Sequence, residues 1–299
     1  MPNETKNLYH YTSLEGLKGI ISNDSFFFTN SLSLNDRSEG KEIFSVLSEV
    51  LETIEISNKF YSRLNNLTWK TLIEVSELNF YVLSLCEDRD NLTMWNYYTK
   101  SSNSLGVNLV LDLKELAEKF VYYLDEEIPV RTDNLNWWHT YGSVIYDDNE
   151  KYRILKSIIE ITDAEIKRNF NEDIFSQFLS IFRVLSIFFK NQYFKVGNEY
   201  RFVIALSMEQ LTTYIQQRKK DEQNKSEKIE YRFRASNGTI QPYLNVPLLK
   251  KWNYPHIRTL KNVVLSPAFD ENSTDGIRAL LDFHRYNYTE IFKSQMPLR

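Results

Sequence analysis

The sequence predicts an α+β protein with a mixed β-sheet core and helical insertions. Short runs rich in β-branched and aromatic residues are typical of strands, and longer segments between them carry apolar residues at helical spacing. No internal repeat and no linker rich in proline, glycine or serine divides the 299 residues. We therefore expect a single α+β domain over residues 1–299, with helical insertions near 37–78 and 149–191.

The beginning of the chain predicts a strand, a helix and a second strand. Residues 8–11 alternate as a strand requires. Thr12 and Glu15 have the spacing of a capping box, with Thr12 as the N-cap, so we expect a helix over residues 13–21. The apolar run 26–28 predicts a short buried strand.

The remaining elements follow from periodicity in the same way. Two helices are expected within 39–78, the second near 64–77, and further helices near 91–98, 149–168, 172–191 and 273–285. Strands are expected near 80–85, 105–111, 140–146, 199–206, 239–246, 261–266 and 289–293. The charged run 217–230 is expected to be a solvated insertion or the end of a helix.

Composition and motifs exclude several classes of function. The 8 glycines form neither a G-x-G pair nor a GxxxxGK[ST] loop, so the usual dinucleotide fingerprint and the Walker A loop are absent from the sequence. The single cysteine, Cys86, excludes an intrachain disulfide and a multi-cysteine zinc site. The 4 histidines are scattered, so we expect no metal site. A net charge of −4 gives no electrostatic argument for bulk nucleic-acid binding.

The sequence also predicts a cytoplasmic protein without a membrane partner. Its first residues lack the charged and apolar regions of a signal peptide. The most apolar segment, 175–189, is interrupted by polar residues and is too short to span a bilayer. We expect this segment to be a buried helix.

His10 is the first residue that could carry chemistry. It lies near the end of a predicted strand that turns directly into a capped helix, where a polar side chain can face a cleft. An imidazole there can donate a hydrogen bond to a ribose hydroxyl. The alternative is a core histidine bonded to a backbone carbonyl.

Ser84 and two aromatic residues form a second cluster. Ser84 lies near the end of a predicted strand, and Trp95 and Tyr98 lie on the helix that follows. Their rings could stack against a base or a nicotinamide. Alternatively, the i, i+3 spacing of Trp95 and Tyr98 anchors this helix to the sheet.

Glu199 and Arg201 form a third cluster, on one face of a strand that follows a Gly-Asn turn. A carboxylate at this edge can act as a base or bind a sugar hydroxyl, and the alternative is a surface ion pair that contributes little stability. Asn35 and Asp36 lie in a polar loop. They are expected either to form an Asx turn and helix cap or to line a ligand site from its opposite wall.

The order of these segments resembles a widespread, uncharacterised bacterial family of the domain-of-unknown-function kind. The resemblance rests on YHYTS at residues 9–13, ND-x-x-E at 35–39, MW-x-x-Y at 94–98 and EYRFV at 199–203. It spans nearly the whole chain, and its specificity comes from the order and spacing of short motifs. Some members occur near phage-defence genes, so the resemblance implies a phage-defence or toxin effector.

That family is in turn distantly similar to the ADP-ribosyltransferase superfamily, whose shared plan is a split β-sheet. The plan carries a histidine on the first strand, a hydroxyl or aromatic residue on the central strand and a glutamate on a late strand. The similarity implies that His10 holds the nicotinamide ribose, while Tyr11 and Thr12 contact the carboxamide through their backbone. Ser84 would lie on the central strand, and Glu199 would be the catalytic carboxylate.

The same similarity implies that Trp95, with Tyr97 or Tyr98, flanks the nicotinamide ring. Asn35 and Arg201 are further candidates for this cofactor-binding site. The sequence departs from the best-known members because it lacks the S-T-S triplet on the central strand and the Q/E-x-E pair before the late strand.

The resemblance therefore implies an NAD-dependent ADP-ribosyltransferase-like enzyme, a transferase or an NAD glycohydrolase, with NAD as its substrate. The acceptor would be a protein, a nucleic acid or water, and a regulatory partner or a homo-oligomer is left open. Cleavage of the nicotinamide–ribose bond passes through an oxocarbenium-like state, whose developing charge Glu199 would stabilise.

Two alternatives stand beside this hypothesis, namely a non-enzymatic sensor or interaction module and a nucleic-acid-processing enzyme. A single cleft lined by His10, Tyr98 and Glu199 would favour the NAD-consuming enzyme. Separation of Glu199 from His10 by the sheet, with Glu199 neutralised by Arg201, would favour the non-enzymatic module.

Overall fold

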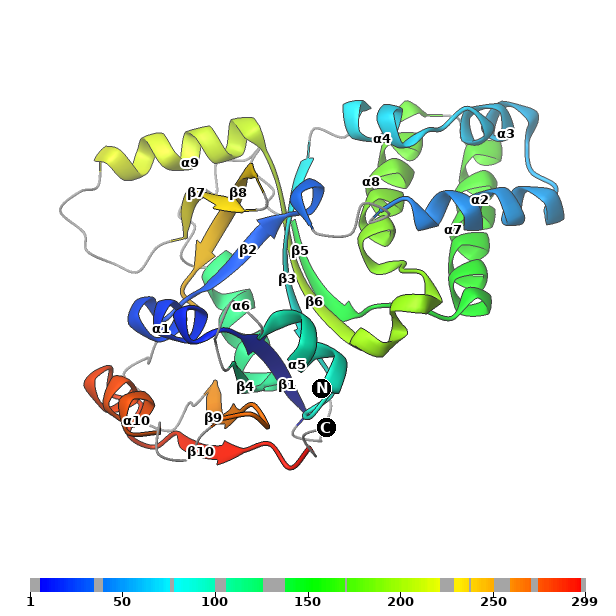
Figure 1. Ribbon diagram of the computed structural model, residues 1–299. Coiled ribbons are helices and arrows are strands. Elements are labelled where there is room, and N and C mark those ends of the chain that lie inside the picture. Colours follow the sequence, from blue (N-terminus) through cyan, green and yellow to red (C-terminus); the bar gives the residue numbers. More distant parts are fainter. Residues whose placement is uncertain are drawn as a thin grey trace.

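The computed structural model confirms an α+β fold with a mixed sheet (Figure 1). It describes residues 6–34, 40–75, 78–99, 106–125, 138–169, 171–220, 229–236, 238–249, 259–269 and 274–296. The strands are β1 Asn7–Thr12, β2 Phe26–Asn30, β3 Leu78–Cys86, β4 Val107–Asp112, β5 Trp138–Ser143, β6 Glu199–Ser207, β7 Glu230–Ser236, β8 Thr239–Val246, β9 Leu260–Leu265 and β10 Glu290–Lys293. The α-helices are α1 Leu14–Asn23, α2 Glu42–Thr53, α3 Asn58–Asn65, α4 Trp69–Val75, α5 Leu92–Tyr98, α6 Leu113–Asp125, α7 Asp148–Arg168, α8 Glu172–Phe188, α9 Met208–Lys220 and α10 Thr274–Phe283.

The sheet branches at β3. Within the described residues, the strand order is β10-β9-β4-β1-β3-β2-β8-β7, and β6 pairs with both β3 and β5. Along one edge, β3 pairs with β6 over its whole length, ending at the pair of Cys86 and Glu199. The other edge of β3 is shared, because β2 pairs with it near Val82 and β1 pairs with it at Cys86. The sheet therefore separates into two arms, one continuing from β1 and the other from β2.

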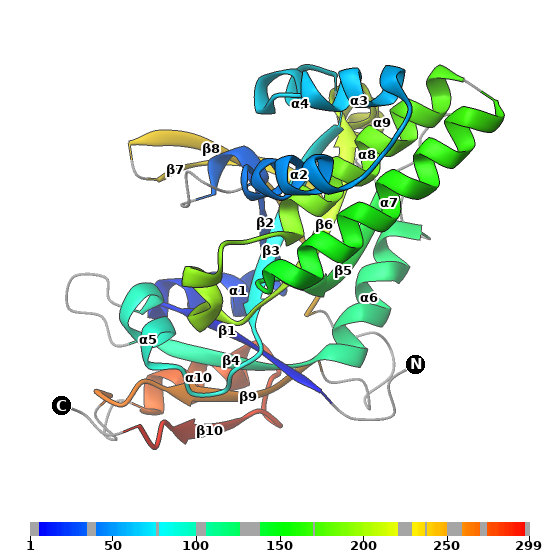
Figure 2. The same cartoon turned by 90° about the vertical axis from the view of Figure 1, so that its right-hand side faces the viewer.

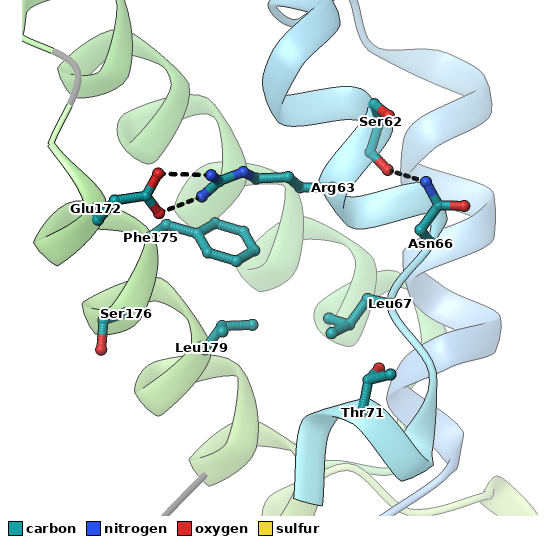
Figure 3. A pocket seen from close by; sticks show the side chains of 9 residues that line it. All are labelled: Ser62, Arg63, Asn66, Leu67, Thr71, Glu172, Phe175, Ser176 and Leu179. Atoms are coloured by element: carbon teal, nitrogen blue, oxygen red, sulfur yellow. Dashed lines mark hydrogen bonds and ion pairs between the residues drawn. The ribbon is translucent and has the colours of Figure 1, made fainter. Parts of the chain in front are cut away.

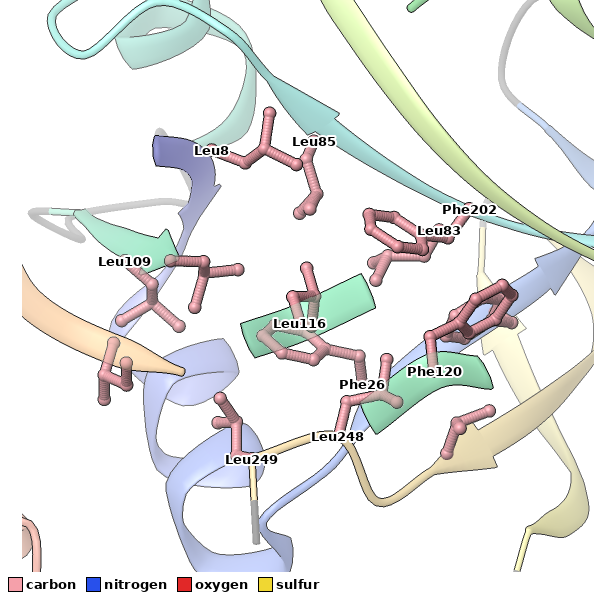
Figure 4. Packing of buried hydrophobic residues seen from close by; sticks show 14 of the residues in the cluster. Leu8, Phe26, Leu83, Leu85, Leu109, Leu116, Phe120, Phe202, Leu248 and Leu249 are labelled. Atoms are coloured by element: carbon pink, nitrogen blue, oxygen red, sulfur yellow. The ribbon is translucent and has the colours of Figure 1, made fainter. Parts of the chain in front are cut away.

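Helices cover both faces of the central strands (Figures 1 and 2). On one side, α2, α3, α4, α7 and α8 form a helical layer with its own apolar core, which includes Leu47, Leu155 and Phe182. The α8 residue Phe188 packs with Val203 of β6, so this layer also rests on the sheet. On the other side, α1, α6, α9 and α10 close the largest core, which Figure 4 shows in part.

The ranges 37–78 and 149–191, where helical insertions were expected, contain helices α2 to α4 and helices α7 and α8. The first insertion holds three helices rather than the expected two. The reason lies at Thr68 and Thr71, where each backbone amide donates to the other residue's hydroxyl. These two hydrogen bonds separate α4 from the end of α3 and fix the start of α4. The second insertion ends at Phe188, three residues before the expected end at 191.

The prediction that Thr12 caps the first helix is wrong. Ser13 is the N-cap of α1, and its hydroxyl accepts a hydrogen bond from the Gly16 amide at 3.1 Å. Thr12 still belongs to β1, where it pairs with Val107 of β4. The strand therefore runs one residue further than its alternation indicates, and the cap moves with it.

The sequence patterns missed α6, α9 and β7. Helix α6 follows β4 without a loop, and its first turn is capped by Asp112, whose carboxylate accepts from the Glu115 amide at 3.0 Å. Residues 217–220 of the charged run form the end of α9, which confirms one of its two interpretations, and Glu230 begins β7. Residues 221–228 of the run lie outside the described residues. The strand expected at 140–146 begins earlier, at Trp138, and ends at Ser143.

Candidate functional site

Backbone hydrogen bonds fix Glu199 at the start of β6. Asn198, just before it, has a φ of 37°, in the left-handed region that asparagine tolerates. The chain thereby turns out of the 3₁₀ segment η2 (Gln192–Gly197) into the strand. The Glu199 amide donates to the Tyr146 hydroxyl at 3.1 Å, and its carbonyl accepts from the Val144 amide at 2.8 Å. The carboxylate therefore projects from a rigid backbone.

The Glu199 carboxylate is shared by two cations. Its Oε2 accepts from Nε and Nη2 of Arg201 at 3.0 and 2.7 Å. Its Oε1 accepts from the Nζ of Lys190, which lies between α8 and η2. Only 11% of the Glu199 side chain is exposed, and Arg201 is almost completely buried. This is a buried three-member ion network rather than the surface pair considered above.

The network keeps Glu199 ionised. Burial alone would raise the pKa of Glu199, but the charges of Arg201 and Lys190 and their hydrogen bonds lower it from 4.5 to about 2. Arg201 also donates from Nη1 to the carbonyl of Ile187 at the end of α8. The ion network therefore joins β6 to the helical layer.

A second buried cation continues this connection. Lys151 of α7 is fully buried, and its Nζ lies 2.8 Å from a carboxylate oxygen of Glu42 and 2.6 Å from one of Asp148. The same Nζ donates to the carbonyl of Lys190 at 3.1 Å. Helices α2 and α7 are thus tied to the segment that carries one partner of Glu199.

His10 lies in the fork of the sheet, where β1 and β2 leave β3. Its ring meets that of Phe26 edge to face, with centroids 5.4 Å apart, and hydrogen-bonds to the backbone of Ser84. Burial lowers the pKa of His10 to about 4, although the bond to Ser84 acts in the opposite direction. This neutral, packed ring corresponds to the core histidine that the sequence left as an alternative.

His10 and Glu199 project from opposite faces of the sheet. Cys86 pairs with Tyr9 on one side and with Glu199 on the other, so these three side chains share a face. His10 follows Tyr9 and therefore projects the other way, toward Phe26 and the core that Figure 4 shows. The structure does not bring the expected catalytic pair together.

Tyr11 and Trp95 do share the face of Glu199, but each holds other parts of the chain. The Tyr11 hydroxyl donates to the Asp88 carbonyl and accepts from the Asn91 amide, both at 2.9 Å. The rings of Tyr11 and Trp95 meet edge to face at 4.8 Å, and the Trp95 indole donates to Asp90 at 2.6 Å. Trp95 is buried, so it anchors α5 to the sheet, as the alternative interpretation expected.

The other predicted site residues are distributed around this region. Ser84 of β3 lies directly opposite Arg201 of β6, so the two side chains project from the same face of the sheet. Tyr98 is 52% exposed at the end of α5, and Tyr97 is more exposed still. Thr12 lies at the end of β1 beside Gly16. Asn35 and Asp36 lie outside the described residues.

Sequence reasoning missed Lys190, Tyr146 and Lys151. Lys190 and Tyr146 reach Glu199 because Phe189 and Ile145 form a parallel bridge that brings α8 beside the end of β5. No periodic pattern predicts this bridge. Lys151 gave no signal of its own, because the helix expected at 149–168 carries several other cations, among them Arg153 and Lys156.

Two cavities of the described structure lie elsewhere. The larger, of about 550 Å³, opens between α3, α4 and α8 (Figure 3). There Arg63 forms a double hydrogen bond with Glu172 and lies over the Phe175 ring. The smaller, of about 210 Å³, is lined by Arg183 of α8 together with residues of β3. Neither cavity is lined by Glu199 or His10.

Two further searches of the described residues bear on metal binding and on membranes. No group of three or more His, Cys, Asp or Glu side chains gathers as a set of metal ligands there. No helix in that part of the chain has both the length and the apolar character needed to cross a membrane.

Comparison with known proteins finds a family model that matches part of the chain. Neither the curated proteins nor the solved structures contain a match to this chain. A family model described as "Protein of unknown function (DUF2971)" matches residues 94–202, from α5 to β6. This segment includes Trp95, Tyr98, Glu199 and Arg201. This match confirms the resemblance to an uncharacterised family over residues 94–202, and the motifs at residues 9–13 and 35–39 lie outside it.

Proposed function

We propose that this protein is a non-enzymatic binding module, a sensor or interaction protein, and that it does not consume NAD. One observation carries the proposal. Glu199, the residue expected to be the catalytic carboxylate, is enclosed by Arg201 and Lys190 on the face of the sheet opposite to His10.

An NAD-cleaving carboxylate has to bind the ribose and face the charge that develops on it. Glu199 could do so only by giving up Arg201 or Lys190. Removing one partner of a buried ion pair costs about 3–5 kcal/mol. Because about 1.4 kcal/mol corresponds to a tenfold change in affinity, NAD binding would weaken by about two to four orders of magnitude.

The residues expected to position NAD already have structural partners. His10 fills the fork between β1 and β2, and Tyr11 holds the loop before α5. The Trp95 ring is only 3% exposed, so a nicotinamide could not stack on it without displacing α5. These contacts support the proposal that His10, Tyr11 and Trp95 stabilise the branched sheet.

A nicotinamide-release assay, with calorimetric titration of NAD, tests the proposal. The comparison uses the wild type, Glu199→Gln and the control Glu172→Gln, whose exposed carboxylate lies in the distant larger cavity. We expect no release above the buffer blank from any of the three proteins. Release by the wild type above the blank would overturn the proposal, and its loss in E199Q but not in E172Q would identify Glu199 as the catalytic carboxylate. The NAD-dependent enzyme that the resemblance implied stays a prediction, and the same assay decides it.

A further inference from the structure

Arg183 is a buried cation that has no carboxylate partner among the described residues. It lies on α8 and is 3% exposed. Its Nη1 donates to the Ser186 hydroxyl at 3.2 Å, and its Nη2 lies 3.5 Å from the Ser31 hydroxyl, at the limit of a hydrogen bond. The buried Nε has no acceptor. Among the described residues, all of its contacts are with neutral groups.

Comparison with Arg201 shows that the neutral surroundings of Arg183 are unusual for a buried cation. Arg201 is buried to a similar degree but forms two hydrogen bonds to the Glu199 carboxylate. Buried charges in proteins are normally paired, since desolvation of an unpaired ion costs several kcal/mol. Arg183 is instead held over the rings of Trp69 and Phe80, at 4.6 and 5.1 Å from their centroids. These cation–π contacts recover only part of that cost.

Arg183 faces a cavity that could hold the missing anion. The cavity has a volume of about 210 Å³ and lies at the junction of α8, α4, β3 and the end of β2. Its wall is mixed, because Ser31 and Asn79 supply polar groups and Ile73 and Phe80 supply apolar surface. Since a water molecule occupies about 30 Å³, the space accommodates a group of several atoms.

We propose that this cavity binds the carboxylate or phosphate group of a small anionic molecule. A guanidinium presents N–H groups in a fork that matches the oxygens of either group. Burial lowers the pKa of Arg183 to about 10, so it remains charged at neutral pH. The volume is below the roughly 300–1,000 Å³ of sites for drug-sized ligands, which favours a small ligand.

This inference deepens the proposed binding function, on which it rests, by naming a ligand class. The cavity is lined from both the helical layer and the sheet, through Arg183 of α8 and Asn79 of β3. An anion held there would therefore bridge the two layers. Such a bridge suits a sensor, because a ligand that contacts two layers can change how they pack.

The test is a titration of the full chain with inorganic phosphate and, separately, with acetate. Sodium chloride keeps the ionic strength constant, and both calorimetry and the melting temperature are recorded. The variants are Arg183→Met and the control Arg63→Met, which removes the cation of the larger cavity. R183M should fold, because replacing an unpaired buried charge by an apolar side chain is often neutral or stabilising.

We expect saturable binding and a rise in melting temperature for the wild type and R63M, with affinity at least tenfold weaker in R183M. Saturation by phosphate alone identifies a phosphate group, and saturation by acetate alone identifies a carboxylate. The inference is overturned if neither anion saturates the wild type, or if R183M binds as the wild type does. That failure is distinct from failure of the proposed function, which depends on nicotinamide release.

Discussion

Replacing Glu199 by glutamine should destabilise the fold by about 3 kcal/mol at pH 7. The change keeps the size of the side chain but removes the charge that Arg201 and Lys190 share. The pKa of Glu199 falls from 4.5 to about 2 in the folded chain. This difference corresponds to about 3 kcal/mol, because each pH unit is equivalent to about 1.4 kcal/mol. It agrees with the cost of about 3–5 kcal/mol for breaking a buried pair.

The pH dependence of stability follows from the same value. A carboxylate whose folded pKa is lowered stabilises the fold above its unfolded pKa and loses that effect as the pH falls. For Glu199, the stabilisation should be complete above about pH 4.5 and should disappear as the pH falls toward about 2. The variant E199Q should lack this part of the acid-induced loss.

Urea denaturation measures this prediction directly, as the free energy of unfolding from the linear dependence on urea. The control E172Q removes an exposed carboxylate that pairs with Arg63 on the surface of the helical layer. It should change stability little, because exposed ion pairs are screened by solvent. If E199Q unfolds at the same urea concentration as E172Q, the buried network is not what stabilises this region.

Three further variants test separate parts of the fold. Because burial favours the neutral His10 ring, the wild type should lose at most about 3 kcal/mol of stability as the pH falls from 6.5 toward about 4. The variant His10→Gln should not show this loss. An unchanged pH profile of the melting temperature would contradict this prediction. Ser13→Ala should cost about 1 kcal/mol in urea denaturation and Thr12→Ala less, because Ser13 caps α1; the reverse order would restore Thr12 as the cap. Trp95→Phe should cost about 1.5–3 kcal/mol through the lost bond to Asp90; a neutral result would show that this bond does not anchor α5.

Apolar runs made β3 and β6 predictable, and β8 was predicted correctly at both of its ends. β3 and β6 are mostly apolar because helices cover both of their faces, and the expected ranges 80–85 and 199–206 lie within them. β7 escaped prediction because it is an edge strand with a partly exposed, charged surface, as the 60% exposure of Phe233 indicates. α9 is largely polar, so its apolar periodicity is weak.

Part of the candidate site could be predicted, because alternation along a strand is local. It placed Glu199 and Arg201 on one face, and their hydrogen bonds confirm this. The relation between Glu199 and His10 depends instead on the register of β1, β3 and β6, which a single sequence does not specify. Arg183 interrupted a predicted apolar helix, but only the packed structure shows that no carboxylate of the described residues pairs with it.

The central claim is that Glu199 belongs to a structural ion network and is not available to NAD. The pKa of its carboxyl group, measured by carbon-13 NMR in the presence and absence of NAD, tests this most directly. The account predicts a pKa of about 2 that NAD does not change. A pKa near or above 4.5, or one that rises when NAD is added, would contradict it.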